Sequence, residues 1–250
     1  MFFLLTNDDG VEAPGLAALE AAVGGLAECW TVAPATEQSA KSHALTMHEP
    51  LRVVPHGPRR FAVTGTPADC VYLAVHHLLP GRPTMVLSGI YRGSTLATDV
   101  HFSGTVAAAR EAATMDIPAV AASLWARTPS PHWDTAGAVV RRLVEELLAH
   151  GLAPGLLLNL NVPDVPAGEL RGVRPAAMGR RYYQPRVEAT TDPRGRGYYW
   201  IGGDHDRFDD LPETDGPLCE AGYATVTPLM LDLTAQAFLP TLRTWKLDVP

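Results

Sequence analysis

The sequence predicts an α/β protein in which βα units surround a buried, mostly parallel sheet. Through the first two thirds of the chain, short apolar runs that end in polar or Gly residues alternate with longer segments of helical spacing. The length of 250 residues fits one generous domain, or one domain with an appendage.

Five apolar runs are expected to form the strands of this sheet. Pro34 ends the second of them and Gly89 is expected to close the third. The runs are Phe2–Thr6, Trp30–Ala33, Met85–Ser88, Ala119–Leu124 and Leu156–Val162.

Four segments between or after these runs are expected to be helices. Residues 67–79 carry Val71, Ala74, Val75 and Leu78 on one face, which is the helical spacing of apolar side chains. An Ala-rich helix is expected to begin near Ser103, where a hydroxyl can cap the first amides. The other two are Pro14–Leu26, with Pro14 in its first turn, and Thr135–His150, stopped by Gly151.

The composition changes after Pro163, and three regions are expected. Residues 1–162 form the core, residues 163–217 a hairpin extension used for oligomerisation, and residues 218–250 a returning strand and a C-terminal tail. Asp192-Pro193-Arg194-Gly195 is a turn signal between two Tyr-containing runs. In the tail we expect a strand over Tyr223–Thr227 and a helix from Thr234 that Pro240 breaks or kinks.

The charge and the apolar runs exclude several classes of partner. With 20 basic and 27 acidic side chains the net charge is −7, so the basic patch that neutralises a nucleic-acid polymer is missing. No stretch approaches the roughly 18 apolar residues of a membrane span, and the N-terminus lacks the features of an export signal. Three scattered cysteines, Cys29, Cys70 and Cys219, indicate neither a disulfide framework nor a zinc site. We therefore expect a cytoplasmic protein that binds no membrane and no polymeric nucleic acid.

Asp8 and Asp9 follow the first predicted strand directly. Ligands of open α/β sheets bind outside the carboxyl ends of the strands, and paired carboxylates there suit a hard divalent cation. The alternative is that one of them merely caps the next helix. Repulsion between adjacent carboxylates makes a cation more favourable here than beside a single Asp, and both alternatives stay open.

A second candidate site is the triplet Ser103, Gly104 and Thr105, at the start of the Ala-rich helix. Free amides and the helix dipole favour phosphate there, although the same triplet is also an ordinary helix cap. The segment Thr64–Asp69 carries the same ambiguity. The adjacent His76 and His77 point to different helix faces and are expected to be surface or packing residues.

The scarcity of lysine disfavours two other schemes based on acidic pairs. Lys41 and Lys246 are the two lysines of the chain. Receiver domains and haloacid-dehalogenase-type phosphatases both need a lysine in the site, and neither residue falls where those schemes require it.

Motifs along essentially the whole chain resemble the SurE (survival protein E) family of divalent-metal-dependent 5'/3'-nucleotidases. The matching segments keep their order and spacing, which is more specific than any single motif. They include Leu4–Gly10, Ala13–Leu16, Val32–Pro34, Gln38–Ala40, Gly65–Val71, Leu87–Gly89, Ser103–Ala109, Leu158–Pro163, Asp192–Gly195, Tyr199–Trp200 and Gly222–Leu229.

The resemblance implies a Rossmann-like core with a hairpin extension, assembled as a homodimer or homotetramer whose C-terminal segments are exchanged between subunits. It implies one Mg²⁺ or Mn²⁺ per subunit, held by Asp8, Asp9 and Ser39, and a nucleoside monophosphate substrate whose phosphate contacts Ser103, Gly104 and Thr105. Asp8 and Asp9 are the expected catalytic residues, one of them accepting the proton of the attacking water.

The chain departs from the family pattern after Ser88-Gly89. Tyr91 stands where the family has a metal-binding Asn, Thr95 replaces a second Asn, and Ala97 replaces a Gly. A phenol with an ordinary pKa of about 10 is a poor ligand for a hard cation. An alternative is therefore a weak or inactive homologue that acts as a nucleotide-binding or assembly protein.

Overall fold

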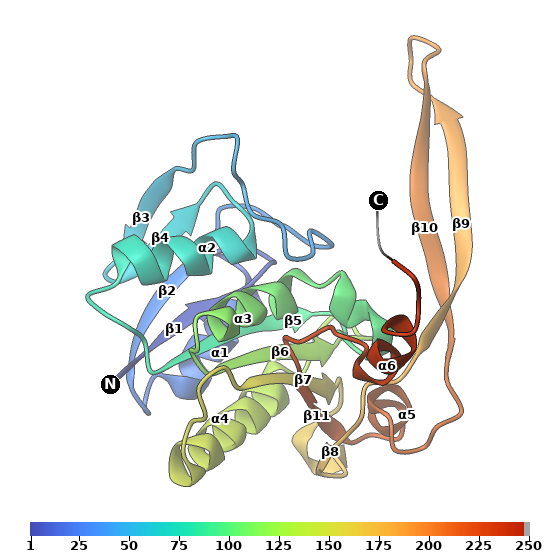
Figure 1. The fold of residues 1–250 in the computed structure, drawn as a ribbon. Helices are drawn as coiled ribbons and strands as arrows, with labels where there is room; N and C mark the ends of the chain where they lie inside the picture. Colours follow the sequence, from blue (N-terminus) through green and yellow to red (C-terminus); the bar gives the residue numbers. More distant parts are fainter. Residues whose placement is uncertain (248–250) are drawn as a thin grey trace.

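A computed structural model describes residues 1–247, apart from the side chains of His205 and Asp206. A nine-stranded sheet forms its centre, in the order β3-β4-β2-β1-β5-β6-β7-β11-β8 (Figure 1). The five central strands, β2, β1, β5, β6 and β7, pair in parallel, as predicted. Their bounds are Glu28–Pro34, Phe2–Thr6, Met85–Arg92, Ala119–Trp125 and Leu157–Pro163.

Helices cover both faces of this sheet, which confirms the predicted fold class. α1 (Pro14–Val23) and α4 (Trp133–His150) pack together over one apolar cluster, which includes Leu16 and Val140. α2 (Pro67–Leu73) and α3 (Gly104–Thr114) cover the second cluster on the opposite face. The predicted helix over residues 67–79 is α2 continued by a π-helical turn, Ala74–Leu78.

The strand β5 continues past the residue that was expected to close it. The prediction that Gly89 ends the strand is wrong, because β5 runs on to Arg92 with a shift of register against β6 between Ser88 and Tyr91. A Cβ atom at Gly89 would lie 2.2 Å from the carbonyl oxygen of Ala122, so glycine permits this close approach of the two strands. The extension carries Tyr91 to the end of the sheet.

A long two-stranded arm projects from the core (Figure 1). Its strands, β9 (Arg181–Thr191) and β10 (Gly197–Phe208), pair antiparallel across the predicted turn at residues 192–195. After β10 the chain leaves the base of the arm and continues into α5 (Asp215–Glu220). The arm therefore connects directly to segments packed beside the sheet.

The last part of the described chain returns to the sheet. β11 (Ala224–Leu229) pairs antiparallel with β7 and parallel with the short β8 (Val173–Pro175). The prediction that a helix begins at Thr234 is wrong. A 3-10 turn spans Gln236–Phe238, and Pro240 lies in the first turn of α6 (Leu239–Leu242), where its missing N–H costs no hydrogen bond. The expected tail, residues 218–250, extends beyond the described residues.

One edge of the sheet was not predicted. β3 (Val53–Gly57) is an exposed edge strand that pairs antiparallel with β4 (Arg60–Val63), and β4 pairs in parallel with β2. Across the described residues 1–247, no helix is both long and apolar enough to cross a membrane.

Candidate functional site

The turn after β1 places two adjacent carboxylates at the carboxyl end of the sheet. The buried Asn7 carboxamide donates to the carbonyl oxygen of Gly10 (2.8 Å) and accepts from its amide (3.2 Å), which fixes the turn around Asp8 and Asp9. α1 begins only at Pro14 with Ala13 as its N-cap residue, so neither carboxylate caps that helix. The capping alternative for this pair is therefore wrong.

The start of α3 lies against Asp8. The Thr105 hydroxyl donates a hydrogen bond of 2.6 Å to Oδ1 of Asp8, and both residues are buried. A Cβ atom at Gly104 would lie 2.9 Å from Cβ of Asp8 and 3.0 Å from its Oδ2. Glycine thus lets the first turn of α3 approach the carboxylate, and the structure brings the two candidate motifs together.

Ser103 is the N-cap residue of α3. Its hydroxyl oxygen accepts a hydrogen bond of 3.0 Å from the Val106 amide. The cap at Thr64–Asp69 is more complete, because Thr66 and Asp69 form a reciprocal capping box at the start of α2. The Thr64–Asp69 motif is thus a helix cap in this structure.

Ser39 lies in the loop after β2, and hydrogen bonds connect this loop and the end of β5 to the acidic pair. The Ser39 hydroxyl donates to the Glu37 carboxylate at 2.9 Å, and the neighbouring Gln38 amide donates to the Asp8 carbonyl oxygen at 2.7 Å. Oδ2 of Asp9 accepts from the Arg92 amide at 3.1 Å. The backbone of the loop after β2 is thereby held against the turn after β1.

Burial makes the acidic pair unfavourable as two free anions. Burial raises the pKa of Asp8 to about 7, with a further increase from the charge of Asp9, although the Thr105 hydroxyl opposes the shift. Burial also raises the pKa of Asp9, with a contribution from the charge of Glu37 and opposition from the Arg92 amide. A bound cation would relieve this cost.

Tyr91 lines two cavities, one with each carboxylate of the acidic pair. Its side chain borders the cavity lined by Asp8 and also a second cavity lined by Asp9 and Glu37. Burial, followed by the charges of Asp8 and Asp9, raises the pKa of Tyr91 to about 12. The phenol is therefore protonated at neutral pH and offers a cation no anionic oxygen.

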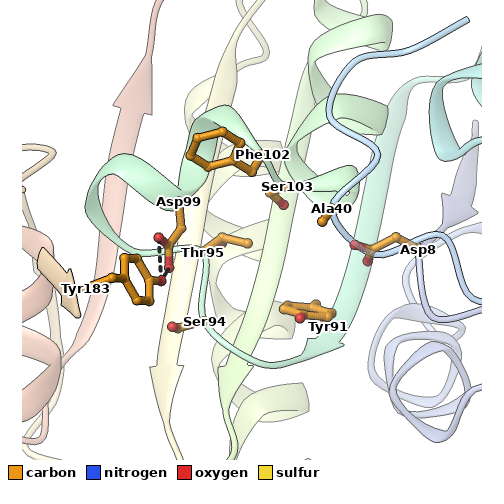
Figure 2. Close-up of a pocket in the computed structure, with 9 residues that line it drawn as sticks. All are labelled: Asp8, Ala40, Tyr91, Ser94, Thr95, Asp99, Phe102, Ser103 and Tyr183. Atoms are coloured by element: carbon orange, nitrogen blue, oxygen red, sulfur yellow. Dashed lines mark hydrogen bonds between the residues drawn. The ribbon is translucent and has the colours of Figure 1, made fainter. Parts of the chain in front are cut away.

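The cavity beside Asp8 has a volume of about 240 Å³. Figure 2 shows Asp8 on one side of it and Tyr183 on the opposite side, with Tyr91 and Ser103 between them. Tyr183 comes from β9 at the base of the arm. The cavity therefore joins the predicted site to a part of the chain that was expected to serve oligomerisation.

The sequence did not predict the far wall of this cavity. The Tyr183 hydroxyl lies 2.7 Å from both carboxylate oxygens of Asp99, and Arg181 donates to Oδ2 of Asp99 at 2.5 Å and to Ser94 at 2.8 Å. More than 80 residues separate the arm from Asp99, so no local spacing could connect them. The Tyr-rich composition of the hairpin was the one available signal.

Thr95 anchors the segment that follows β5. Its hydroxyl lies 2.9 Å from Oγ of Ser123 and donates to Oδ1 of Asn159 at 2.9 Å, while its amide donates to Oδ1 of Asn161 at 2.8 Å. The carboxamide of Asn159 in turn donates to the Thr95 carbonyl oxygen at 2.7 Å. All four side chains are buried. Thr95 thus secures the end of β5 to β6 and β7 by hydrogen bonds.

Fold and site together define a Rossmann-like α/β protein with an acidic pair that faces a helix N-terminus at the carboxyl ends of parallel strands, where ligands of this fold class bind. Residues 3–185 match the family model of survival protein SurE. The chain belongs to the SurE family, as its motifs predicted.

Known members of the family align with nearly the whole chain. The 5'-nucleotidase SurE of Citrifermentans bemidjiense is 47% identical over 99% of this chain and 100% of its own length. The 5'/3'-nucleotidase SurE of Serratia proteamaculans is 44% identical over 98% of this chain and 96% of its own length. The crystal structure of the SurE protein from Aquifex aeolicus superposes with a TM-score of 0.85, at 35% identity, over 97% and 98% of the two chains.

Proposed function

We propose that this protein is a divalent-metal-dependent phosphomonoesterase that hydrolyses nucleoside 5'- and 3'-monophosphates to nucleoside and phosphate. The 5'- and 5'/3'-nucleotidases among its relatives support the substrate class. The observation that carries the site is the Thr105–Asp8 hydrogen bond, because it joins the acidic turn to the start of α3. A cation site and a phosphate site would then be neighbours.

The donor set near Asp8 fits a hard divalent cation. Asp8, Asp9 and Ser39 offer two carboxylates and a hydroxyl, and Mg²⁺ and Mn²⁺ favour such oxygen ligands. No cluster of three or more His, Cys, Asp or Glu side chains suited to a metal occurs within the described part of the chain. We infer that these three residues hold one ion per subunit and that water completes its coordination. When bound, Mg²⁺ or Mn²⁺ would polarise the phosphoryl group and lower the pKa of a water molecule.

The start of α3 would hold the phosphate of the substrate. The amides of Gly104 and Thr105 belong to the first helical turn, whose N–H groups lack carbonyl partners within the helix, and the helix dipole favours an anion there. Ser103 closes this turn as its cap and lines the cavity. These groups would stabilise the negative charge that builds up on the phosphoryl oxygens during the reaction.

The acidic pair would also manage the proton of the attacking water. Hydrolysis forms a bond between the water oxygen and phosphorus and breaks the bond from phosphorus to the nucleoside oxygen. A carboxylate oxygen of Asp8 or Asp9 would accept the proton, which then becomes available to the departing nucleoside oxygen. This mechanism needs no covalent intermediate with the protein.

A second candidate function is favoured by Tyr91. Its protonated phenol borders both carboxylates at the position where the family has an Asn ligand. Binding of a nucleotide without turnover, or with weak turnover, would follow if the three remaining donors hold the ion too loosely.

Phosphate release from purified protein separates these two functions. Nucleoside 5'- and 3'-monophosphates are incubated with Mg²⁺ or Mn²⁺, with a chelator, and with the Asp8→Asn variant. The proposed activity requires release that depends on the metal and on Asp8. Nucleotide binding without such release would favour the second candidate.

We further propose a homodimer or homotetramer in the cytoplasm. Exposed apolar side chains on the arm, including Trp200 and Ile201, and on the tail, including Leu233 and Trp245, suit burial against further copies of the chain. Exchange of the C-terminal segment between subunits would bury the tail. Three unpaired cysteines agree with a reducing compartment. Light scattering that detects only monomer at micromolar concentration would refute the assembly.

A further inference from the structure

The cavity beside Asp8 extends beyond the proposed phosphate site. Asp8 and Ser103 border one part of it, whereas Phe102 and Tyr183 border the rest (Figure 2). A phosphate monoester bound with its phosphate at Ser103 has room for its remaining atoms in the rest of this cavity. The side chains there would then contact the leaving group of the substrate.

Phe102 offers an aromatic face at this cavity. Its side chain is 65% exposed although the residue is held at both backbone groups. The Phe102 amide donates to the Asp99 carbonyl oxygen at 3.0 Å, and the Phe102 carbonyl oxygen accepts from the Ser42 amide at 3.1 Å. Since Ser103 follows directly, these bonds place the backbone that carries the ring one residue from the proposed phosphate site.

Tyr183 supplies a second ring, and this one is held through its own hydroxyl. Its hydroxyl is hydrogen-bonded to both oxygens of Asp99 (Figure 2), and Arg181 binds the same carboxylate. Asp99 and Arg181 have side chains only 17% and 10% exposed. The ring therefore enters the cavity in a prepared orientation, which lowers the entropy lost when a ligand binds.

We propose that the nucleoside part of the substrate binds between these groups, with Phe102 and Tyr183 as specificity-determining aromatic contacts. This inference rests on the proposed function and names the part of the substrate that the far cavity recognises. Stacking on an aromatic ring tolerates every base, because each base has a π-face. The site should consequently accept purine and pyrimidine nucleotides and disfavour phosphate esters without a base.

The test compares two substrates that share a phosphate monoester. Adenosine 5'-monophosphate carries a base, whereas glycerol 2-phosphate does not. With Mn²⁺ present, Phe102→Ala should lower kcat/KM for adenosine 5'-monophosphate about tenfold, as expected for a lost stacking contact, and leave kcat/KM for glycerol 2-phosphate within about twofold. Phe102→Tyr keeps the ring and should restore the nucleotide preference. Tyr72→Ala removes an exposed ring on α2 that does not line the cavity, and serves as the matched control.

The second contact has its own variant. Tyr183→Leu should lower kcat/KM for adenosine 5'-monophosphate relative to kcat/KM for glycerol 2-phosphate. Circular dichroism reports whether this variant keeps its fold. Because Phe102 is exposed and outside the core, Phe102→Ala alone tests the proposal if Tyr183→Leu does not fold. Equal losses on both substrates, or no loss on either, would overturn the proposal.

Failure of the proposed function would be recognised separately. If the unmodified protein hydrolyses neither ester, calorimetric titration with adenosine 5'-monophosphate still tests the subsite. The proposal then requires that the protein binds the nucleotide and that Phe102→Ala weakens binding at least about fivefold. Unchanged affinity, or no binding to the unmodified protein, would contradict it.

Discussion

The hydroxyl of Thr105 donates a hydrogen bond of 2.6 Å to Oδ1 of Asp8, and this contact joins the first turn of α3 to the turn that follows β1. The two residues are 97 positions apart in the chain. Their pairing orients one carboxylate oxygen and leaves the other, Oδ2, close to Gly104. The proposed cation and phosphate sites therefore share a boundary.

Removal of this hydrogen bond should impair catalysis without unfolding the protein. Thr105→Val keeps the shape of the side chain but removes the donor, and hydrogen bonds to charged groups contribute about 1.5–3 kcal/mol. We expect kcat/KM for nucleoside monophosphates to fall roughly 10- to 100-fold, while Thr105→Ser retains the hydroxyl and stays within about threefold. Steady-state kinetics on the three proteins measure this. Equal activity of the valine and serine variants would show that the hydroxyl is unimportant.

The stability of the metal-free protein should depend on pH through Asp8. Burial raises its folded-state pKa from 3.8 to about 7, so between these values the folded state holds a proton that the unfolded state has lost. The contribution of Asp8 to the free energy of unfolding therefore falls as pH rises from about 4 to about 7 and then stays low.

A cation should offset this loss, because it favours the ionised carboxylate. We expect Mn²⁺ to raise Tm more at pH 8 than at pH 5, as measured by calorimetry. In Asp8→Asn both the pH dependence assigned to Asp8 and most of the Mn²⁺ effect should disappear. An equal Mn²⁺ shift at both pH values would contradict proton-linked binding.

Tyr91 should limit metal affinity. Its phenol is kept protonated and borders both carboxylates, whereas Tyr91→Asn would introduce a neutral carbonyl oxygen. We expect this variant to bind Mn²⁺ at least about tenfold more tightly, as measured by calorimetric titration. Tyr91→Phe removes only the hydroxyl and should leave the Mn²⁺ affinity nearly unchanged. If Tyr91→Asn does not tighten binding, the tyrosine is not what weakens the site.

Asp164 should be important for stability rather than activity. Its buried carboxylate accepts hydrogen bonds from the Arg127, Thr128 and His132 amides at 3.0, 3.1 and 2.8 Å, and from the Thr128 hydroxyl at 2.8 Å. Although burial opposes the shift, these bonds together with the His132 side chain lower the pKa of Asp164.

Asp164→Asn should lower the free energy of unfolding by about 2–4 kcal/mol, because buried donors lose a charged acceptor. The stabilisation by the native carboxylate is present above the unfolded pKa near 3.8 and is lost as pH falls through the lower folded value. Urea unfolding measures this change, with the exposed Asp134→Asn in the first turn of α4 as control. Comparable losses in both variants would indicate a general charge effect.

Most of the core was predictable because its strands are continuous apolar runs and its helices have clear starts and stops. Ser103 at the start of α3 and Gly151 after α4 are such signals. β3 was missed because it is a short, exposed edge strand that contains Pro55, and such strands lack the apolar signature of the core. α5 was missed because Gly216 and Pro217 usually disfavour a helix. In the structure, the buried Asp215 at its start accepts the Ala97 and Gly179 amides and anchors it.

The candidate site was predictable only where residues close in sequence act together. Asp8 and Asp9 were predicted as candidates because they follow a strand, but the sequence offered no rule that joins Asp99 to Tyr183. That contact depends on how the arm leaves the core. A resemblance to a family identifies matching motifs, whereas the cavity between them requires the fold.

The anomalous scattering of Mn²⁺ in a crystal soaked with Mn²⁺ and phosphate is the most direct test of the proposed site. We predict one Mn²⁺ peak per subunit in contact with oxygens of Asp8, Asp9 and Ser39, with phosphate at the first turn of α3 and no bond from the ion to Tyr91. A Mn²⁺ peak away from the acidic pair, or phosphate bound elsewhere than at Ser103–Thr105, would contradict the proposal.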